Sequence, residues 1–91
     1  MSYREQLNQY RNELDYLDEQ IIELLNHRFD VTNKIGYLKI EHNQEIYQAG
    51  RESAIMDKLS KKLEQSEHHE AILKLYKELM KISRETQKFL K

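Results

Sequence analysis

Two cations stand where a helical repeat otherwise places apolar side chains, and together they could bind an anion. Arg28 and Lys39 are eleven residues apart. On one helix, that spacing leaves the two side chains only about 20° apart in direction and about 16 Å apart along the axis. A guanidinium buried in an apolar interface is strongly unfavourable unless an anion meets it, and a carboxylate fits its planar fork. The pair therefore predicts a site for a carboxylate ligand inside a helical bundle.

Other polar residues interrupt two later apolar stripes and could complete such a site. Glu52 lies beside Arg51 on the apolar stripe of the second expected helix. Ser83 and Gln87 lie one turn apart on the apolar stripe of the third. These side chains add hydrogen-bond acceptors and donors to the two cations. Each of them alone also fits a plainer interpretation, in which one polar side chain fixes the register of a bundle. Their combination favours a polar cavity for an anionic ligand.

Arg11 cannot reach that cavity in its own chain. It precedes Arg28 by seventeen residues, which on one helix is about 25 Å along the axis and about 100° in rotation. If Arg11 binds the same kind of ligand, it does so in the site of a partner chain.

The apolar spacing predicts the helices that carry these residues. A stripe in alternating steps of four and three predicts one helix over about residues 3–40, with Tyr3, Leu7, Tyr10, Leu14, Leu17, Ile21, Leu24, Arg28, Val31, Ile35 and Leu38 as its members. Gly36 lies inside it at a cost of about 1 kcal/mol, which packing must override. The helix would be about 54 Å long, whereas a 100-residue domain has a radius of gyration of about 13 Å. It is therefore expected to pack against a partner chain.

Two shorter helices follow a connection at residues 40–47. The second is expected over about residues 48–64, where Gln48 is a poor N-cap, and the third over about residues 67–90 with Ser66 as its cap. The expected fold is therefore all-α, with three helices per chain.

Composition excludes several classes of protein. The chain has 91 residues, 2 Gly, 0 Pro and 0 Cys, too few turn formers for a β-sandwich and no thiols for disulfides or zinc. Net charge is −1, which gives no signal for nucleic acid. No segment has the apolar length of a membrane span or signal peptide, and the adjacent His68 and His69 diverge on a helix, so no metal site is expected. A soluble, cytoplasmic protein is expected.

The constellation resembles the all-helical, AroQ-type chorismate mutases over essentially the whole chain. The matching stretches are Y-R-N-E-L-D-Y-L-D-E-Q-I-I-E-L-L-N-H-R (10–28), K-I-G-Y-L-K (34–39), R-E (51–52) and S-R-E-T-Q (83–87). The resemblance implies an intertwined homodimer in which both subunits build each of two active sites, a single domain over residues 1–91, and the conversion of chorismate to prephenate without cofactor or metal.

The resemblance also implies residue roles in binding the two carboxylates of chorismate. Arg28 and Arg11 of the partner subunit would bind them, with help from Arg51 and Ser83.

Further roles concern the ether oxygen and the ring hydroxyl. Lys39 and Gln87 would donate to the ether oxygen of the breaking C–O bond, and Glu52 would accept from the ring hydroxyl. This sequence departs from the family pattern at Gln48, where some relatives carry an aspartate that helps to bind the hydroxyl. An amide oxygen can still accept that bond, but without the charge. The approach to the second helix also lacks the usual proline.

Two other functions stay open from the sequence. An isochorismate–pyruvate lyase would use the same scaffold on a similar dianion, although the complete set of Arg51, Glu52, Ser83 and Gln87 favours the mutase. A non-catalytic helical dimerisation or regulatory module would use its buried polar residues only to fix register.

Overall fold

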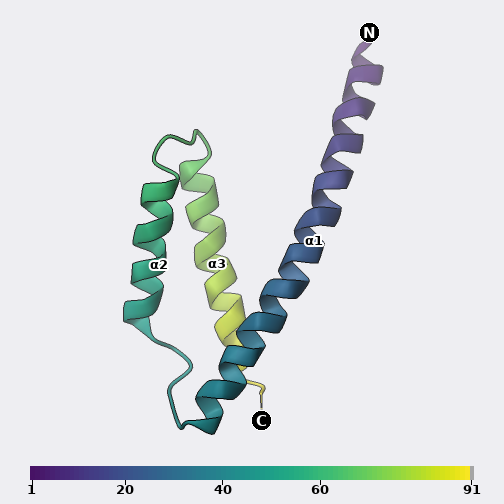
Figure 1. Ribbon diagram of the computed structural model, residues 1–91. Coiled ribbons are helices and arrows are strands. Elements are labelled where there is room, and N and C mark those ends of the chain that lie inside the picture. The colour runs from purple at the N-terminus through teal and green to yellow at the C-terminus, as the bar shows by residue number, and fades with distance from the viewer. Residues whose placement is uncertain (91) are drawn as a thin grey trace. The chain divides into compact units, whose positions relative to one another are not determined.

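The computed structural model describes residues 1–90, which form three helices and no strand (Figure 1). Helix α1 spans Tyr3–Glu41, α2 spans Ala49–Lys62 and α3 spans His69–Gln87. The predicted all-α fold with one very long N-terminal helix is confirmed. None of these helices is long and apolar enough to cross a membrane, as far as residues 1–90 are concerned.

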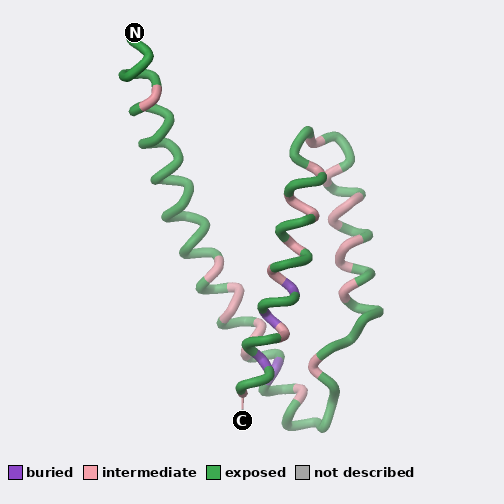
Figure 2. Tube along the Cα trace, turned by 180° about the vertical axis from the view of Figure 1, so that it is seen from behind, coloured by how far each residue is buried: buried purple, intermediate pink, exposed green. Residues whose placement is uncertain are grey.

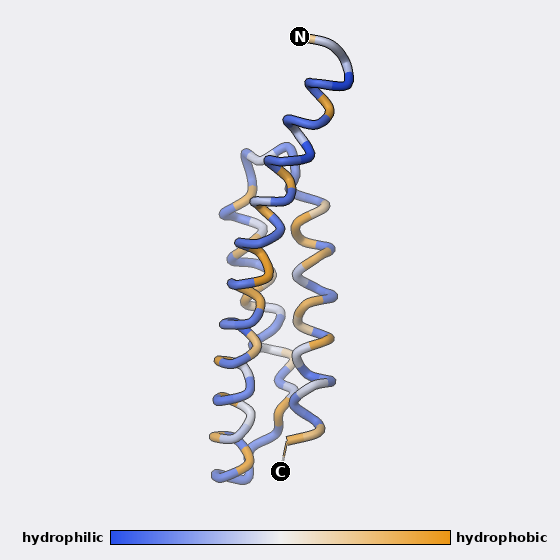
Figure 3. Tube along the Cα trace, turned by 90° about the vertical axis from the view of Figure 1, so that its right-hand side faces the viewer, coloured by the Kyte–Doolittle hydropathy of each residue, from blue (hydrophilic) through white to orange (hydrophobic). Residues whose placement is uncertain are grey.

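The chain forms two compact units, Met1–Val31 and the part from Thr32 onward, and their boundary lies within α1. The first unit is the N-terminal part of that helix. Most of its predicted apolar stripe is exposed, with 56% of Leu14, 51% of Ile21 and 68% of Leu24 accessible (Figure 2). Figure 3 shows hydrophobic positions recurring along the helix. Exposed apolar residues at this spacing form a surface that suits a second helix.

In the second unit, α2 and α3 pack against each other (Figure 1). The buried positions of α3 are Met80, Ser83 and Gln87, with 7%, 6% and 7% of their surface accessible. Their spacing of three and four residues puts them on one face of the helix. Two polar side chains therefore occupy the buried stripe of α3, which is unusual for serine and glutamine.

A Schellman motif ends α1 and explains why the heptad period stops there. Asn43 adopts a positive φ of 56°, a conformation that asparagine tolerates better than most residues. Its N–H donates to the Ile40 carbonyl at 3.2 Å, and the Gln44 N–H donates to the Lys39 carbonyl at 2.8 Å. These two bonds satisfy carbonyls that a helix end would leave unpaired, and they place Lys39 in the last turn.

The other helix ends differ slightly from the expected bounds. Gln48 precedes α2 with no side-chain capping bond, as expected for glutamine at an N-cap. α3 begins at His69, two residues later than expected, because Ser66 accepts hydrogen bonds within the turn that precedes the helix. Its Oγ accepts the N–H of His68 at 3.1 Å, and its carbonyl accepts the N–H of His69. Ser66 is therefore a turn residue rather than the cap of α3.

Candidate functional site

The buried amide of Gln87 is held by the backbone of α1. Its Nε2 donates to the Thr32 carbonyl at 2.5 Å. Because a carbonyl can only accept, this bond sets which end of the amide is the nitrogen. A primary amide has two N–H groups, so one of them remains to donate to another acceptor. Gln87 is thus an oriented donor inside the second unit.

Gly36, the buried residue of α1, permits this arrangement. A Cβ at Gly36 would lie 2.6 Å from Leu90 Cδ1 and 3.2 Å from Gln87 Cγ. A Cβ there would require the flexible Leu90 side chain to shift and Gln87 to move by a few tenths of an ångström. Gly36 therefore offsets its unfavourable helix propensity by making room for Gln87.

We expect Gly36→Ala to lower activity more than stability. Alanine gains about 1 kcal/mol of helix propensity, which offsets part of the crowding, but the new methyl displaces the Gln87 amide. For an activity that uses the Gln87 amide as a donor, we expect kcat to fall by about tenfold or more when the amide is misplaced, with a small change in Tm. Gly50→Ala is the matched control, since a Cβ there meets nothing within 4 Å. An unchanged kcat in folded Gly36→Ala would contradict this role.

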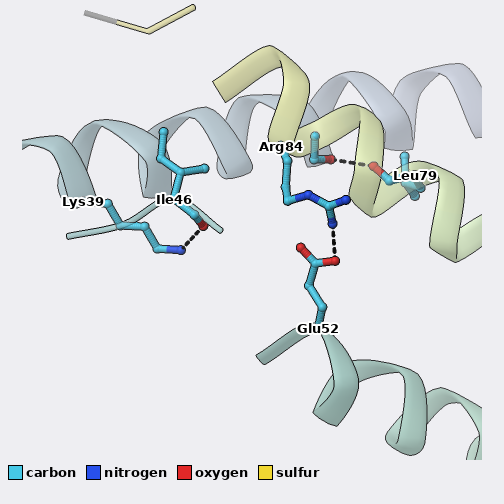
Figure 4. Close-up of polar contacts among 6 residues, drawn as sticks. Lys39, Ile46, Glu52, Leu79 and Arg84 are labelled. Carbon is cyan, nitrogen blue, oxygen red and sulfur yellow. Dashed lines mark hydrogen bonds and ion pairs between the residues drawn. The ribbon is translucent and has the colours of Figure 1, made fainter. Parts of the chain in front are cut away.

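Lys39 lies on the same face of α1 as the residues that contact Gln87. Thr32, Gly36 and Lys39 are spaced by four and three residues, so their side chains share one side of the helix. The half-buried Lys39 donates from Nζ to the Ile46 carbonyl at 2.9 Å (Figure 4). An ammonium has three N–H groups, so two remain for an anion.

Glu52 and Arg84 form an ion pair between α2 and α3 (Figure 4). Arg84 Nη1 donates to Glu52 Oε1, and the side chains are 29% and 24% accessible. The Arg84 guanidinium also lies 4.6 Å from the centre of the Tyr47 ring, within the range of a cation–π contact. The predicted acceptor Glu52 is therefore paired with a cation of its own chain.

Ser83 faces the same buried side of α3 as Gln87. Its Oγ donates to the Leu79 carbonyl at 2.9 Å, the local bond that serine often makes inside a helix.

The other four predicted residues are divided between the two units. Arg11 is exposed and Arg28 half-buried in the first unit, while Gln48 and Arg51 are exposed at the start of α2 in the second. Within the second unit, the structure brings together Gln87 with Thr32 and Gly36, and Glu52 with Arg84.

Two depressions lie between α2 and α3. The larger, about 740 Å³, contains none of the predicted site residues. The smaller, about 380 Å³, is lined by Tyr47, Glu52 and Arg84 among others. Residues 1–90 contain no group of three or more metal-ligating side chains. Lys39 and Gln87 are hydrogen-bond donors, and Glu52 is a carboxylate acceptor, that the second unit could offer to a ligand.

Sequence reasoning missed Arg84 and the contact of Gly36 with Gln87. Arginine is scarce in this chain, with five against ten lysines, so each arginine is informative, and Arg84 follows the buried Ser83 directly. That signal could have identified Arg84 as a candidate, but not Glu52 as its partner 32 residues away.

Comparison with known proteins places this arrangement in a family. Residues 10–88 match the sequence pattern of chorismate mutase type II. Among curated proteins, the chain is 36% identical over 56 residues to the T-protein of Haemophilus influenzae and 38% identical over 55 residues to the bifunctional chorismate mutase/prephenate dehydratase of Aquifex aeolicus. These alignments cover 62% and 60% of this chain but 15% of each relative. No solved structure matches it significantly.

Proposed function

Because the chain belongs to the chorismate mutase type II family, we propose that it catalyses the rearrangement of chorismate to prephenate, a step toward phenylalanine and tyrosine, in the cytoplasm. The observation that carries this proposal is the extent of the family match. All eight predicted site residues, from Arg11 to Gln87, lie within the matched residues 10–88. The oriented donors Lys39 and Gln87 add geometric support.

The active form in this proposal is a homodimer with two shared sites. The exposed stripe of α1, which includes Leu14, Ile21 and Leu24, suits the same stripe of a second copy, because a two-fold interface pairs one surface with itself. Arg11 and Arg28 lie on α1 about 25 Å apart along the axis. Arg11 therefore contributes to the site of its partner, and a single chain holds an incomplete site.

Binding of the substrate dianion rests on arginines and the α3 hydroxyl. Arg28 and Arg11 of the partner subunit bind the two carboxylates, and Arg51 and Ser83 assist. Arginine suits this task because its planar fork donates two hydrogen bonds to one carboxylate. The exposure of Arg11 and Arg51 leaves both side chains accessible to a ligand.

The rearrangement itself is unimolecular, so it needs no nucleophile and no proton transfer from the protein. The site must hold the enolpyruvyl side chain over the ring in a near-attack conformation. It must also stabilise the negative charge that develops on the ether oxygen. Lys39 and Gln87 donate to that oxygen, each with N–H groups left over from its bond to a backbone carbonyl.

The expected energies are of the order that enzymatic catalysis requires. An acceleration of about 10⁶-fold corresponds to about 8 kcal/mol of transition-state stabilisation. Hydrogen bonds to charged groups contribute about 1.5–3 kcal/mol each. Lys39, Arg28 and the partner's Arg11 together approach the required amount.

Gln48→Asp is expected to bind substrate more tightly and to stabilise the chain. A carboxylate accepts a stronger hydrogen bond from the ring hydroxyl than an amide does. Because position 48 is exposed, solvent and salt screen the repulsion between the new carboxylate and the substrate, so KM should fall several-fold. Gln48 also stands at the N-cap of α2 without a capping bond, where aspartate adds about 1 kcal/mol. KM and Tm are measured together. A higher Tm with unchanged KM would mean that residue 48 caps α2 but does not reach the hydroxyl.

Gln87→Glu is expected to make turnover depend on pH. The amide donates at every pH, whereas a glutamate donates only when protonated. The kcat of the variant should therefore be highest in acid and fall as pH rises, while the kcat of the unsubstituted chain stays nearly constant from about pH 6 to 8. A pH profile of kcat for both proteins tests this. Parallel profiles would show that residue 87 does not donate to the ether oxygen.

Product analysis tests the proposed function against the lyase. The purified chain is incubated with chorismate and, separately, with isochorismate, and the products are separated by chromatography. We expect prephenate from chorismate and no rapid release of pyruvate from isochorismate. Pyruvate release without prephenate formation would assign the lyase activity instead, and no reaction with either substrate would favour a non-catalytic dimerisation module.

A further inference from the structure

We propose that Arg84 is a positioning residue for substrate binding, which neutralises Glu52 and orients its carboxylate toward the ring hydroxyl. This inference rests on the proposed function. It assigns a role to Arg84, which received none from the resemblance of the sequence to the family.

Three segments of the second unit hold Arg84 in place. The side chain projects from α3, pairs with Glu52 on α2 and lies 4.6 Å from the ring centre of Tyr47 in the connection before α2. Both charged side chains are about three-quarters buried. Figure 4 shows the guanidinium and the carboxylate pointing toward each other.

The geometry leaves Glu52 able to bind a ligand. Arg84 occupies Oε1, and within residues 1–90 the structure gives Oε2 no hydrogen bond. A carboxylate has about four acceptor positions. Fixing one oxygen limits the rotation of the group, so the other oxygen is held ready for the hydroxyl, and less rotamer entropy is lost on binding.

The positive charge of Arg84 also favours binding of the substrate. Chorismate carries two negative charges, and an unpaired Glu52 beside it would repel the substrate. The Arg84 guanidinium cancels that charge while leaving the acceptor oxygen in place. Removing Arg84 would therefore weaken the binding of a dianion specifically because Glu52 stays charged.

Arginine meets these demands better than lysine would. Its planar guanidinium can donate to the carboxylate while its face lies against an aromatic ring. Both contacts are present at Arg84. Lysine would keep the charge but lose the planar contact with Tyr47.

A double-mutant cycle between positions 84 and 52 tests the proposal. Arg84→Met removes the charge and keeps an unbranched side chain with good helix propensity. We expect it to raise the KM for chorismate on the order of tenfold, with a smaller change in kcat, and to raise it less than about twofold when Glu52→Gln is already present. Arg84→Lys should restore much of the affinity. Lys74→Met, which removes an exposed cation from the same helix, is the control and should leave KM nearly unchanged.

Ionic strength separates this role from a structural one. Added salt screens the repulsion between an unpaired Glu52 and the substrate. The ratio of KM between Arg84→Met and the unsubstituted chain should therefore fall as salt rises from about 0.05 to 0.5 M. A loss of packing alone would leave that ratio constant. Arg84→Gln, measured in the same way, replaces Arg84→Met if the latter fails to fold.

The outcomes distinguish this inference from the proposed function. If the unsubstituted chain turns over chorismate but KM rises equally in both Glu52 and Glu52→Gln backgrounds, Arg84 acts independently of Glu52 and the inference is wrong. An unchanged KM in Arg84→Met overturns it as well. No turnover by the unsubstituted chain overturns the proposed function and this inference with it.

Discussion

Lys39→Ala is expected to reduce turnover of chorismate by at least about 10²–10³-fold, the usual effect of removing one donor from a charge-stabilising site. Nζ donates to the Ile46 carbonyl in this structure, and two N–H groups remain for the ether oxygen. Because charge on that oxygen grows only as the C–O bond breaks, the loss should appear mainly in kcat rather than in KM.

The fold should survive this substitution. Alanine favours the helix, which offsets part of the loss of the bond from the charged Lys39 to Ile46, worth about 1.5–3 kcal/mol. Circular dichroism and thermal unfolding check the fold, and steady-state kinetics measure kcat. Lys34→Ala, an exposed lysine of the same helix, serves as the matched control and should retain full activity. A folded Lys39→Ala protein with normal kcat would contradict the proposed mechanism.

Arg11 is expected to act in the site of its partner, so that two inactive variants complement each other. Arg11→Ala and Lys39→Ala homodimers should both be nearly inactive. In a mixed dimer, the Arg11→Ala chain keeps its own Lys39 and receives an intact Arg11 from its partner. One site is then whole, and the other lacks both groups.

The recovered activity follows from the two-fold symmetry. With random pairing, half of the dimers are mixed and each has one functional site of two. The co-refolded mixture should therefore recover about a quarter of the unsubstituted activity. Mass spectrometry of the native dimers verifies the pairing. A mixture that contains mixed dimers but is no more active than either homodimer would show that Arg11 serves its own chain.

Periodicity predicted the helices and the buried polar stripe, since both depend on spacing along one segment. The stripe of α3 contains Ser83 and Gln87 as buried residues. The sequence also predicts that packing compensates for the low helix propensity of Gly36. Apolar residues of α1 are exposed in this chain, and the partner that the sequence predicts for them stays a prediction.

Contacts between distant residues could not be predicted in the same way. A helical stripe shows which face is buried, but not which residue of another helix meets it. The pairing of Arg84 with Glu52 and the approach of Leu90 to Gly36 depend on how α3 packs against its neighbours. The end of α1 depends on the positive φ of Asn43, which many asparagines do not adopt.

This chain alone is expected to accelerate the conversion of chorismate to prephenate. The most direct measurement follows the disappearance of chorismate with purified chain in a buffer containing EDTA, beside Lys39→Ala protein and buffer alone. We predict an acceleration of about 10⁶-fold or more over buffer, loss of nearly all of it in Lys39→Ala, and prephenate as the product. A rate with the unsubstituted chain equal to that in buffer would contradict the account.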